Sequence, residues 1–199
     1  MPKTPLVYKI AYKISGKRIY DPLVKLVKDH GPWIIGVDIG SGYGLAAEIL
    51  ANSFERLYLV DLDYEMARAA KKRLRCHSSV EVIVADSRSI PLPDSFADLV
   101  YFFDSLHHMP LAEKALSEAV RITKPGGKLA IFDLGGDHPF AKFISFLERT
   151  SGLHSRPLSS DKIIELLTSH NFSIIKARVD LFGMFDVVAV KEDSTEVTS

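Results

Sequence analysis

Three glycines separated by single residues, within the segment 37–44, are the first residues whose type and spacing suggest chemistry. The segment reads Val-Asp-Ile-Gly-Ser-Gly-Tyr-Gly and joins an apolar run, 33–37, to an alanine- and leucine-rich run, 45–51. Gly40 and Gly42 would permit a tight turn and a close backbone approach to a ligand, because they have no Cβ. A helix starting at residue 45 would point its free N–H groups at the same place, which favours a carboxylate or phosphate. The segment therefore predicts the cradle of a nucleotide-type cofactor.

Two carboxylates accompany these glycines. Asp38 lies two positions before Gly40, and Asp61 follows Gly40 at about the 20-residue spacing at which a strand–helix–strand unit returns to its first turn. A carboxylate there can hold both hydroxyls of a ribose through charge-assisted hydrogen bonds. Asp63 could take this role instead, but it also stands where the cap of a following helix is expected. We therefore assign the ribose to Asp61 and the cap to Asp63, with the reverse assignment as the alternative.

The glycine spacing distinguishes two kinds of cofactor. A dinucleotide-binding fingerprint has the pattern G-x-G-x-x-G. Here the third glycine, Gly44, comes one residue earlier, and Leu45 occupies the fingerprint position. The pattern therefore disfavours a pyridine dinucleotide. An ordinary glycine turn that binds no cofactor is the other interpretation.

Apolar runs alternate with helical patterns through most of the chain. The predicted strands are 33–37, 56–60, 80–85, 97–103 and 129–133, and the predicted helices between them are 45–51, 64–74 and 111–121. This alternation favours an α/β, Rossmann-like fold, with a mostly parallel sheet and helices on both faces. Two final strands, 172–179 and 184–190, should pair at one edge after a helix capped by Ser159-Ser160-Asp161, which makes the sheet seven-stranded. We expect one domain, 1–190, and a disordered tail, 191–199.

Composition and charge limit the classes of function. The 199-residue chain is 47% hydrophobic and 25% charged, as expected of one ordinary globular domain. Lysine plus arginine and aspartate plus glutamate both number 25, so no net charge favours nucleic acid or an anionic membrane. The single cysteine, Cys76, excludes an intramolecular disulfide and a cysteine-based metal cluster, and we predict no metal site. No apolar run approaches the roughly 20 residues that span a bilayer, and no signal peptide is evident, so a cytoplasmic protein is expected.

Further motifs follow the later strands in a fixed order. They are Ala85-Asp86-Ser87, Leu92-Pro93-Asp94-Ser95-Phe96, His107-His108-Met109-Pro110 and Lys124-Pro125-Gly126-Gly127. Together with the segment 38–44 and Asp61, they resemble the class I S-adenosylmethionine-dependent methyltransferases. Within that family the chain looks most similar to the small-molecule enzymes that include the ubiquinone/menaquinone-biosynthesis methyltransferases. The resemblance covers about residues 33–134. It departs from the family's Phe-Asp pattern at Ala97, which precedes Asp98, and we therefore give Asp98 a structural role.

The resemblance implies S-adenosylmethionine as the cofactor and an antiparallel last strand. The cofactor-binding residues that it implies are Asp38, Gly40, Ser41, Gly42, Gly44, Asp61, Leu62, Asp86, Ser87 and Asp104. The glycine turn would hold the methionine part, Asp38 would reach its ammonium directly or through a water, and Asp61 would hold the ribose. Asp86 would accept from the adenine amino group and Ser87 would offer its backbone N–H. Alternatively, Asp86 only forms a turn or caps a helix.

The resemblance also implies the reaction, in which a nucleophile of a small-molecule acceptor displaces the methyl group from a sulfonium in line. The catalytic candidates follow the fourth strand, close to where the family layout places the methyl group, and they are Asp104, His107 and His108. Histidine is the natural base at neutral pH. In the other interpretation, one or both histidines only hydrogen-bond backbone groups at the start of a helix.

Two segments are predicted to close over this site. Residues 1–31 form a helical lid in two pieces, whose basic side chains are either a solvated face or a positive rim for an anionic substrate. Residues 135–158 form a substrate cap that carries an apolar stripe at helical spacing: Phe140, Phe143, Ile144, Phe146 and Leu147. We expect this stripe to pack in the core; covering an apolar acceptor is the alternative. His154 and Arg156 could meet an anionic group.

Other functions compete with small-molecule methyl transfer. An NAD(P)-dependent enzyme on a related sheet is disfavoured by the glycine spacing and by the lack of a Tyr-x-x-x-Lys pair. A cofactor-binding protein without catalysis, or a methyltransferase of protein or nucleic acid, are further alternatives. Balanced charge disfavours nucleic acid, and the sequence Asp-Ser-Leu-His at 104–107 replaces the Asn-Pro-Pro-Tyr-type motif of many amino-methylating enzymes. The oligomeric state is not predicted.

Overall fold

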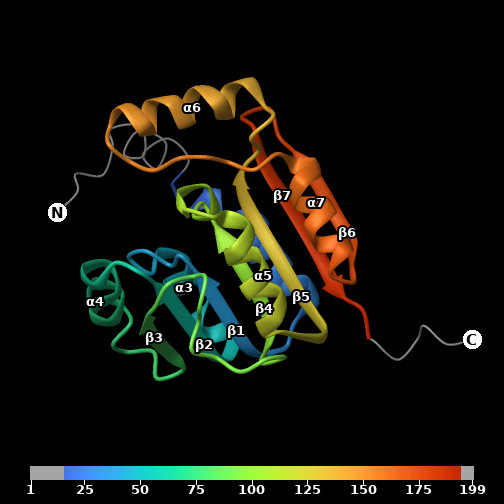
Figure 1. The fold of residues 1–199 in the computed structure, drawn as a ribbon. Coiled ribbons are helices and arrows are strands. Elements are labelled where there is room, and N and C mark those ends of the chain that lie inside the picture. Colours follow the sequence, from blue (N-terminus) through green and yellow to red (C-terminus); the bar gives the residue numbers. More distant parts are fainter. Residues whose placement is uncertain (1–15, 194–199) are drawn as a thin grey trace, which may run out of the picture.

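A seven-stranded, mostly parallel sheet forms the centre of the molecule (Figure 1). The computed structural model describes residues 16–193. In spatial order the strands are β3 (Val80–Val84), β2 (Phe54–Asp61), β1 (Trp33–Ile39), β4 (Ala97–Phe103), β5 (Thr123–Leu134), β7 (Met184–Lys191) and β6 (Phe172–Val179). Only β7 among these strands runs against its neighbours, and it lies between β5 and β6. The predicted fold class and the antiparallel last strand are confirmed.

Helices cover both faces of the sheet. The α-helices are α2 (Asp21–His30), α3 (Leu45–Leu50), α4 (Tyr64–Arg73), α5 (Ala112–Ile122), α6 (Pro139–Thr150) and α7 (Ser160–Ser169), and short 3₁₀ turns are η1 (Gly16–Tyr20), η2 (Ala51–Ser53) and η3 (Leu106–His108). On one face α5 and α7 bury apolar side chains such as Leu116 and Ile163, and on the other α2, α3 and α4 bury Leu23, Leu50 and Ala70. Both faces of the parallel strands are thereby hidden from water. Within the described part of the chain, no helix is long and apolar enough to cross a membrane.

The strand order creates a switch point beside β1. The chain moves outward from β1 through β2 to β3, and then returns to the other side of β1 to form β4 and β5. In open α/β sheets, ligands bind at the carboxyl ends of the strands next to such a point. A ligand is therefore expected at the loops after β1, β2 and β4.

Helix α6 differs from the other helices because it crosses above the carboxyl ends of the strands instead of lying along the sheet (Figure 1). Its buried side chains are Ala141, Ser145 and Glu148, whereas Phe140, Phe143 and Phe146 are 43%, 55% and 54% exposed. The prediction that the aromatic stripe packs in the core is therefore wrong. The physical reason is that α6 rests on polar strand ends and loops, so its small and polar residues face inward.

Several predicted boundaries shift. Strand β5 begins at Thr123 and not at residue 129, and its register against β4 breaks around Pro125-Gly126-Gly127. Helix α2 begins at Asp21, and the side chain of the preceding Tyr20 makes no capping hydrogen bond. Lys191 belongs to β7 and donates through Nζ to the carbonyl oxygens of Val120 and Thr123, so the predicted tail starts too early.

Parts of two predictions fall on residues outside the described range. Of the predicted lid, residues 1–15 lie outside it, and residues 16–31 form η1 and α2, with α2 packed in the core. Residues 194–199 of the predicted tail also lie outside it. The predicted helix cap in Ser159-Ser160-Asp161 is present and is made by Ser159, whose side chain accepts a hydrogen bond from the Lys162 N–H.

Candidate active site

The glycine loop stands at the carboxyl end of β1, against the segment that follows β4. The N–H groups of Gly40 and Ser41 donate to the Val60 carbonyl oxygen at 2.8 and 3.2 Å, which ties the loop to β2. A Cβ on Gly40 would lie 2.6 Å from Cβ of Ser105 and 2.8 Å from Cε of Met109, so only glycine fits there. A Cβ on Gly42, where φ is +53°, would meet nothing within 4 Å. The loop thus packs tightly on the protein at Gly40 and is open at Gly42, as a ligand cradle requires.

Asp63 caps helix α4, as predicted, and Asp61 contacts the glycine loop. Asp63 Oδ1 accepts from the N–H groups of Glu65 and Met66 at 2.8 and 3.0 Å, and so caps α4. Asp61 Oδ2 accepts from Gly42 N at 2.7 Å, and its Oδ1 accepts from Asp63 N at 2.9 Å. Burial raises the pKa of Asp61, although these backbone N–H groups oppose the rise. The structure places the Asp61 carboxylate on the glycine loop, with the exposed Leu62 beside it.

Asp38 is a buried carboxylate whose charge is poorly compensated. It lies opposite Tyr101 in the pairing of β1 with β4, and only 2% of it is exposed. Burial raises its pKa to about 7; the nearby Tyr101 hydroxyl opposes this rise and the Asp61 charge adds to it. Even so, Asp38 Oδ2 and the Tyr101 hydroxyl make no hydrogen bond of ordinary geometry within residues 16–193, nor does the buried Ser41 Oγ. Unsatisfied buried polar atoms at the glycine loop indicate a missing polar partner.

Asp86 follows β3 and takes part in a turn. Its Oδ1 accepts from the Arg88 N–H at 2.9 Å, and its carboxylate forms an ion pair with the Arg88 guanidinium at 2.5 Å. The hydrogen bonds from Arg88 lower the pKa of Asp86 to about 2. The turn-forming interpretation of Asp86 is thus realised, and a contact with adenine through Asp86 or the neighbouring Ser87 stays a prediction.

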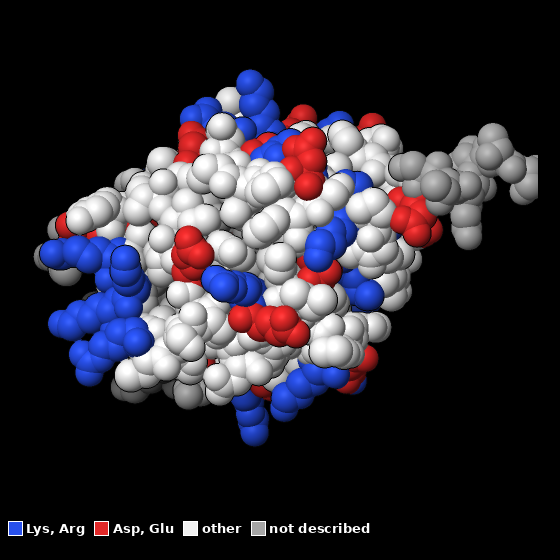
Figure 2. All heavy atoms as spheres, turned by 90° about the horizontal axis from the view of Figure 1, so that it is seen from below, with Lys and Arg blue, Asp and Glu red and all other residues white. Residues whose placement is uncertain are grey.

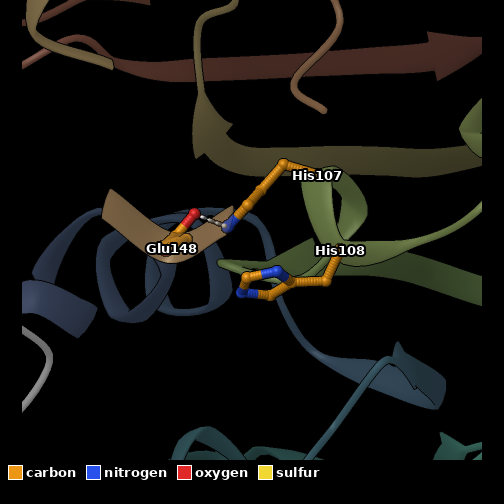
Figure 3. Close-up of side chains that lie close together, drawn as sticks. All are labelled: His107, His108 and Glu148. Carbon is orange, nitrogen blue, oxygen red and sulfur yellow. Dashed lines mark ion pairs between the residues drawn. The ribbon is translucent and has the colours of Figure 1, made fainter. Parts of the chain in front are cut away.

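A second group of polar side chains lies beyond β4, around η3 (Figure 3). Asp133, at the end of β5, accepts through Oδ2 from the N–H groups of Ser105, Leu106 and His107, at 3.2, 2.6 and 3.2 Å. Its Oδ1 pairs with His107 Nδ1. Asp133 was missed as a site residue, although an acid at the end of the fifth strand was the signal that could have found it.

His107 is buried between carboxylates. Its Nδ1 faces Asp133, and its Nε2 lies 3.5 Å from Oε2 of Glu148 on α6, with less than 2% of either residue exposed (Figure 3). Burial alone would lower the pKa of His107, but Asp133 and Glu148, with Asp104 adding to them, raise it well above its usual value. Burial would likewise raise the pKa of Asp133, and His107 outweighs this effect and lowers it. We therefore describe His107 as an imidazolium that joins α6 to β5.

His108 points to a different environment from His107. Its Nδ1 lies 2.6 Å from the His154 carbonyl oxygen, and its ring is centred 3.9 Å from the ring of His107. A carbonyl oxygen only accepts, so Nδ1 carries a proton and Nε2 is the basic nitrogen of the neutral ring. Burial lowers the pKa of His108, and the charge of His107 lowers it further. A half-buried, neutral imidazole is the state that a general base needs.

Asp104 begins the segment that carries the histidines. It adopts a left-handed conformation with φ of +51°, and its N–H donates to the Phe132 carbonyl oxygen at 2.8 Å. Burial raises its pKa to about 7, with His107 opposing the rise and Asp133 adding to it. Aspartate tolerates this backbone region better than most residues do.

Two sets of side chains place ligand atoms close enough together for a metal ion, all within 4.8 Å of one another. They are His107, His108 and Glu148, and Asp104, His107 and Asp133. His107 belongs to both sets, and both of its ring nitrogens already face carboxylates. The imidazolium supplies the positive charge that these carboxylates need, and we assign no metal to them.

Comparison with known proteins identifies the family. Residues 37–131 match the family model described as a methyltransferase domain. The chain is 30% identical over 191 residues to a malonyl-[acyl-carrier protein] O-methyltransferase of Geobacter sulfurreducens, covering 94% of this chain and 69% of that protein. The chain belongs to the class I S-adenosylmethionine-dependent methyltransferases.

A second curated enzyme and a solved structure are also similar to this methyltransferase. It is 32% identical over 123 residues to the ubiquinone/menaquinone biosynthesis C-methyltransferase UbiE of Cupriavidus taiwanensis, covering 60% of this chain and about half, 48%, of that enzyme. The N-methyltransferase NodS of Bradyrhizobium japonicum, solved with S-adenosyl-L-homocysteine, shares 17% identity and a TM-score of 0.72, over 89% of this chain and 87% of that one. The last similarity concerns the fold alone.

The cofactor of this methyltransferase is S-adenosylmethionine, and the residues at the switch point fit it. The cofactor carries an ammonium, which suits the poorly compensated Asp38, and a ribose diol, which suits Asp61. The open side of Gly42 leaves room for a ligand to approach the backbone. Of the predicted residues, the structure brings Asp38, Asp61 and the glycines together, while Asp86 is turned toward Arg88.

Proposed function

We propose that this methyltransferase methylates a small-molecule acceptor by in-line displacement, with His108 as the general base. The supporting observation is the hydrogen bond from His108 Nδ1 to His154 O, which leaves Nε2 as the basic nitrogen. His108 is also close to the cofactor cradle in the fold. Its segment is fixed to β1 by the Ser105 hydroxyl, which donates to Ile39 O at 2.8 Å, and packs against Gly40.

For this reaction the protein must hold the acceptor in line with the methyl group and supply one proton acceptor. S-adenosylmethionine supplies, when bound, a methyl group on a positively charged sulfur that leaves readily. His108 Nε2 would take the proton of the acceptor's hydroxyl or amine as that group is methylated, which typically contributes 10²–10⁴-fold in rate. Holding the acceptor in line can supply about 7–11 kcal/mol. His107, which stays protonated, would support the segment and not act as the base.

A small acceptor is supported by the relatives and by the surface charge. One relative is named for ubiquinone and menaquinone biosynthesis. Figure 2 shows the face of the molecule away from α6, where cations gather over α4 and the remaining charges of both signs are interspersed. The last turn of α4 carries Lys71, Lys72 and Arg73, where they complement the helix dipole. This face therefore gives no support to nucleic acid as the acceptor, and a cytoplasmic location stays a prediction.

Methyl transfer from labelled S-adenosylmethionine into a fractionated cell extract tests the proposal. We expect label in the small-molecule fraction with the natural chain, and a strongly reduced rate with His108→Gln, which keeps a donor for His154 O but removes the base. Label that appears only in protein or nucleic acid would contradict the small-molecule acceptor. Full turnover by His108→Gln would contradict the role of His108.

A further inference from the structure

A second cleft lies beside α6, formed by residues that take no part in the glycine loop. Its volume is about 220 Å³, and it is lined by Gly136, Lys142, Ser145, Arg149, Arg156 and Pro157. Three of these six residues are cations and none is an acid. We propose that this cleft binds an oxyanion, a carboxylate or phosphate group, of the methyl acceptor. The proposal rests on the function proposed above and narrows its substrate class to anionic molecules.

The first support is the way in which Arg149 is held. Its Nη1 donates to Ser145 Oγ at 2.7 Å and to the Ser155 carbonyl oxygen at 2.9 Å. The two serines are buried and bonded to each other, since Ser155 Oγ donates to Ser145 Oγ at 2.9 Å. The guanidinium is therefore positioned by neutral groups, which leave its charge uncompensated. A planar guanidinium fixed in this way is suited to a carboxylate or phosphate.

The second support is the charge balance at the cleft. Within residues 16–193, neither Arg149 nor Arg156 forms an ion pair, in contrast to Arg88 and Arg121, which do. The third lining cation, Lys142, faces an acid: burial raises the pKa of Asp137, and the charge of Lys142 is among the influences that lower it. The Asp137 carboxylate is itself turned to Ser160, whose N–H and hydroxyl lie 3.3 Å from Oδ1. Two arginine charges thus remain for a ligand.

The third support is a wall shared by the cleft and the catalytic histidine. Three successive residues form it, each through the backbone. The His154 carbonyl oxygen accepts from His108, the Ser155 carbonyl oxygen accepts from Arg149, and the Arg156 N–H donates to the His107 carbonyl oxygen at 2.8 Å. An acceptor anchored at this wall by its anionic group can extend toward His108. The cleft then orients the acceptor as well as selecting it.

Binding of inorganic phosphate to the full chain tests the cleft without a known acceptor. Calorimetric titration is compared among the natural chain, Arg149→Gln, Arg156→Gln and the matched control Arg56→Gln, which removes an exposed cation on β2. We expect millimolar phosphate to bind the natural chain and the control alike, and both cleft variants about tenfold more weakly, since each loses a charge-assisted contact. Absence of phosphate binding to the natural chain, or equal affinity in the cleft variants, would overturn the proposal.

S-adenosylmethionine affinity and the labelled product separate this proposal from the function on which it rests. All four proteins should bind the cofactor equally, because the cleft lies apart from the glycine loop. The acceptor found by labelling should carry a carboxylate or phosphate, and Arg156→Gln should raise its KM with little change in kcat. A neutral acceptor that is methylated through His108 would overturn the anion cleft and leave the proposed function standing. Label found only in macromolecules would overturn the proposed function itself.

Discussion

The carboxyl edge of the sheet carries buried or half-buried carboxylates in two places, and Asp38 and Asp61 in the first differ from Asp133 in the second in how their charge is compensated. Asp38 and Asp61, on β1 and β2, have pKa values raised mainly by burial, and backbone N–H groups and a tyrosine hydroxyl compensate them only in part. Asp133, on β5, has a lowered pKa because the His107 imidazolium outweighs its burial. Asp38 and Asp61 are suited to bind a ligand that carries a positive charge and hydroxyl groups. Asp133 is satisfied within the protein and supports the loop that carries His108.

Removal of His107 should cause the largest loss of stability, because His107 is the cation between Asp133 and Glu148. His107→Ala leaves Asp133 and Glu148 buried without their cation, and breaking a buried pair in this way costs about 3–5 kcal/mol. The free energy of unfolding from denaturant titration measures the loss. The matched variant His108→Ala removes a half-buried ring whose Nδ1 donates to a neutral carbonyl oxygen and not to a buried carboxylate, and should cost about 1 kcal/mol. Equal losses for the two variants would show that the network around His107 has no special weight.

Turnover should depend most on His108, whereas stability should depend most on His107. His108→Gln should lower kcat by about 10²-fold or more, equivalent to roughly 2.7 kcal/mol, because the proton acceptor is lost. Calorimetry should find its affinity for S-adenosylmethionine unchanged. A pH–rate profile adds a check. In the natural chain kcat should fall at low pH as His108 becomes protonated, and this acidic limb should be absent from the variant. If the limb persisted in His108→Gln, another group would be the base.

The first group, Asp38 and Asp61, is tested by the two aspartates after β2. Asp61→Ala should weaken S-adenosylmethionine binding by about 30-fold, or roughly 2 kcal/mol, since the ribose and the Gly42 N–H both lose a carboxylate. Asp63→Ala is the matched control, and should cost about 1 kcal/mol of stability as a lost helix cap while leaving cofactor affinity intact. The opposite pattern would exchange the roles of the two residues.

The pH dependence of cofactor binding should show a smaller effect, at Asp38. Its pKa is raised from 3.8 to about 7, so below pH 7 the carboxyl becomes protonated and should hold the cofactor ammonium less well, by at most about tenfold for each pH unit. The stability of the free protein should depend on pH in the opposite direction. Because the folded-state pKa lies above the usual value, ionisation is disfavoured in the folded state, and stability falls as pH rises from about 4 to about 7.

Asp38→Asn sharpens this test because Asp104 has a similarly raised pKa of about 7. The variant should bind the cofactor with little dependence on pH, while part of the dependence of stability on pH persists through Asp104. Titrations at several pH values, beside denaturant unfolding at the same values, make the comparison. Unaltered pH dependence of cofactor binding in the variant would exclude Asp38 as the group responsible.

The same contrast explains which parts of the site could be predicted from sequence. The Gly40 loop, Asp61 and the Asp63 cap follow one another along a single strand–helix–strand unit, so spacing alone placed them. Glu148 could not be placed in this way, because it reaches His107 from a helix that begins after β5. No local pattern links the two residues.

Helix α6 shows a different limit of sequence reasoning. Periodicity correctly indicated a helix with one aromatic face, but it does not say which face is turned inward. That depends on what lies beneath the helix, and here it is the polar ends of the strands. Phe143 and Phe146 are consequently exposed, whereas Ser145 is buried.

The position of β7 has a consequence for the assembly of the chain during synthesis. β7 follows β5 and β6 in the chain, yet it pairs with β5 on one side and β6 on the other. Until Lys191 has left the ribosome, β5 remains an open edge and β6 has no neighbour, and unpaired edges of this kind invite association with other chains. A chain that stops before β7 should therefore be lost to aggregation rather than yield a shortened enzyme, and long non-local pairing of this kind is expected to form late.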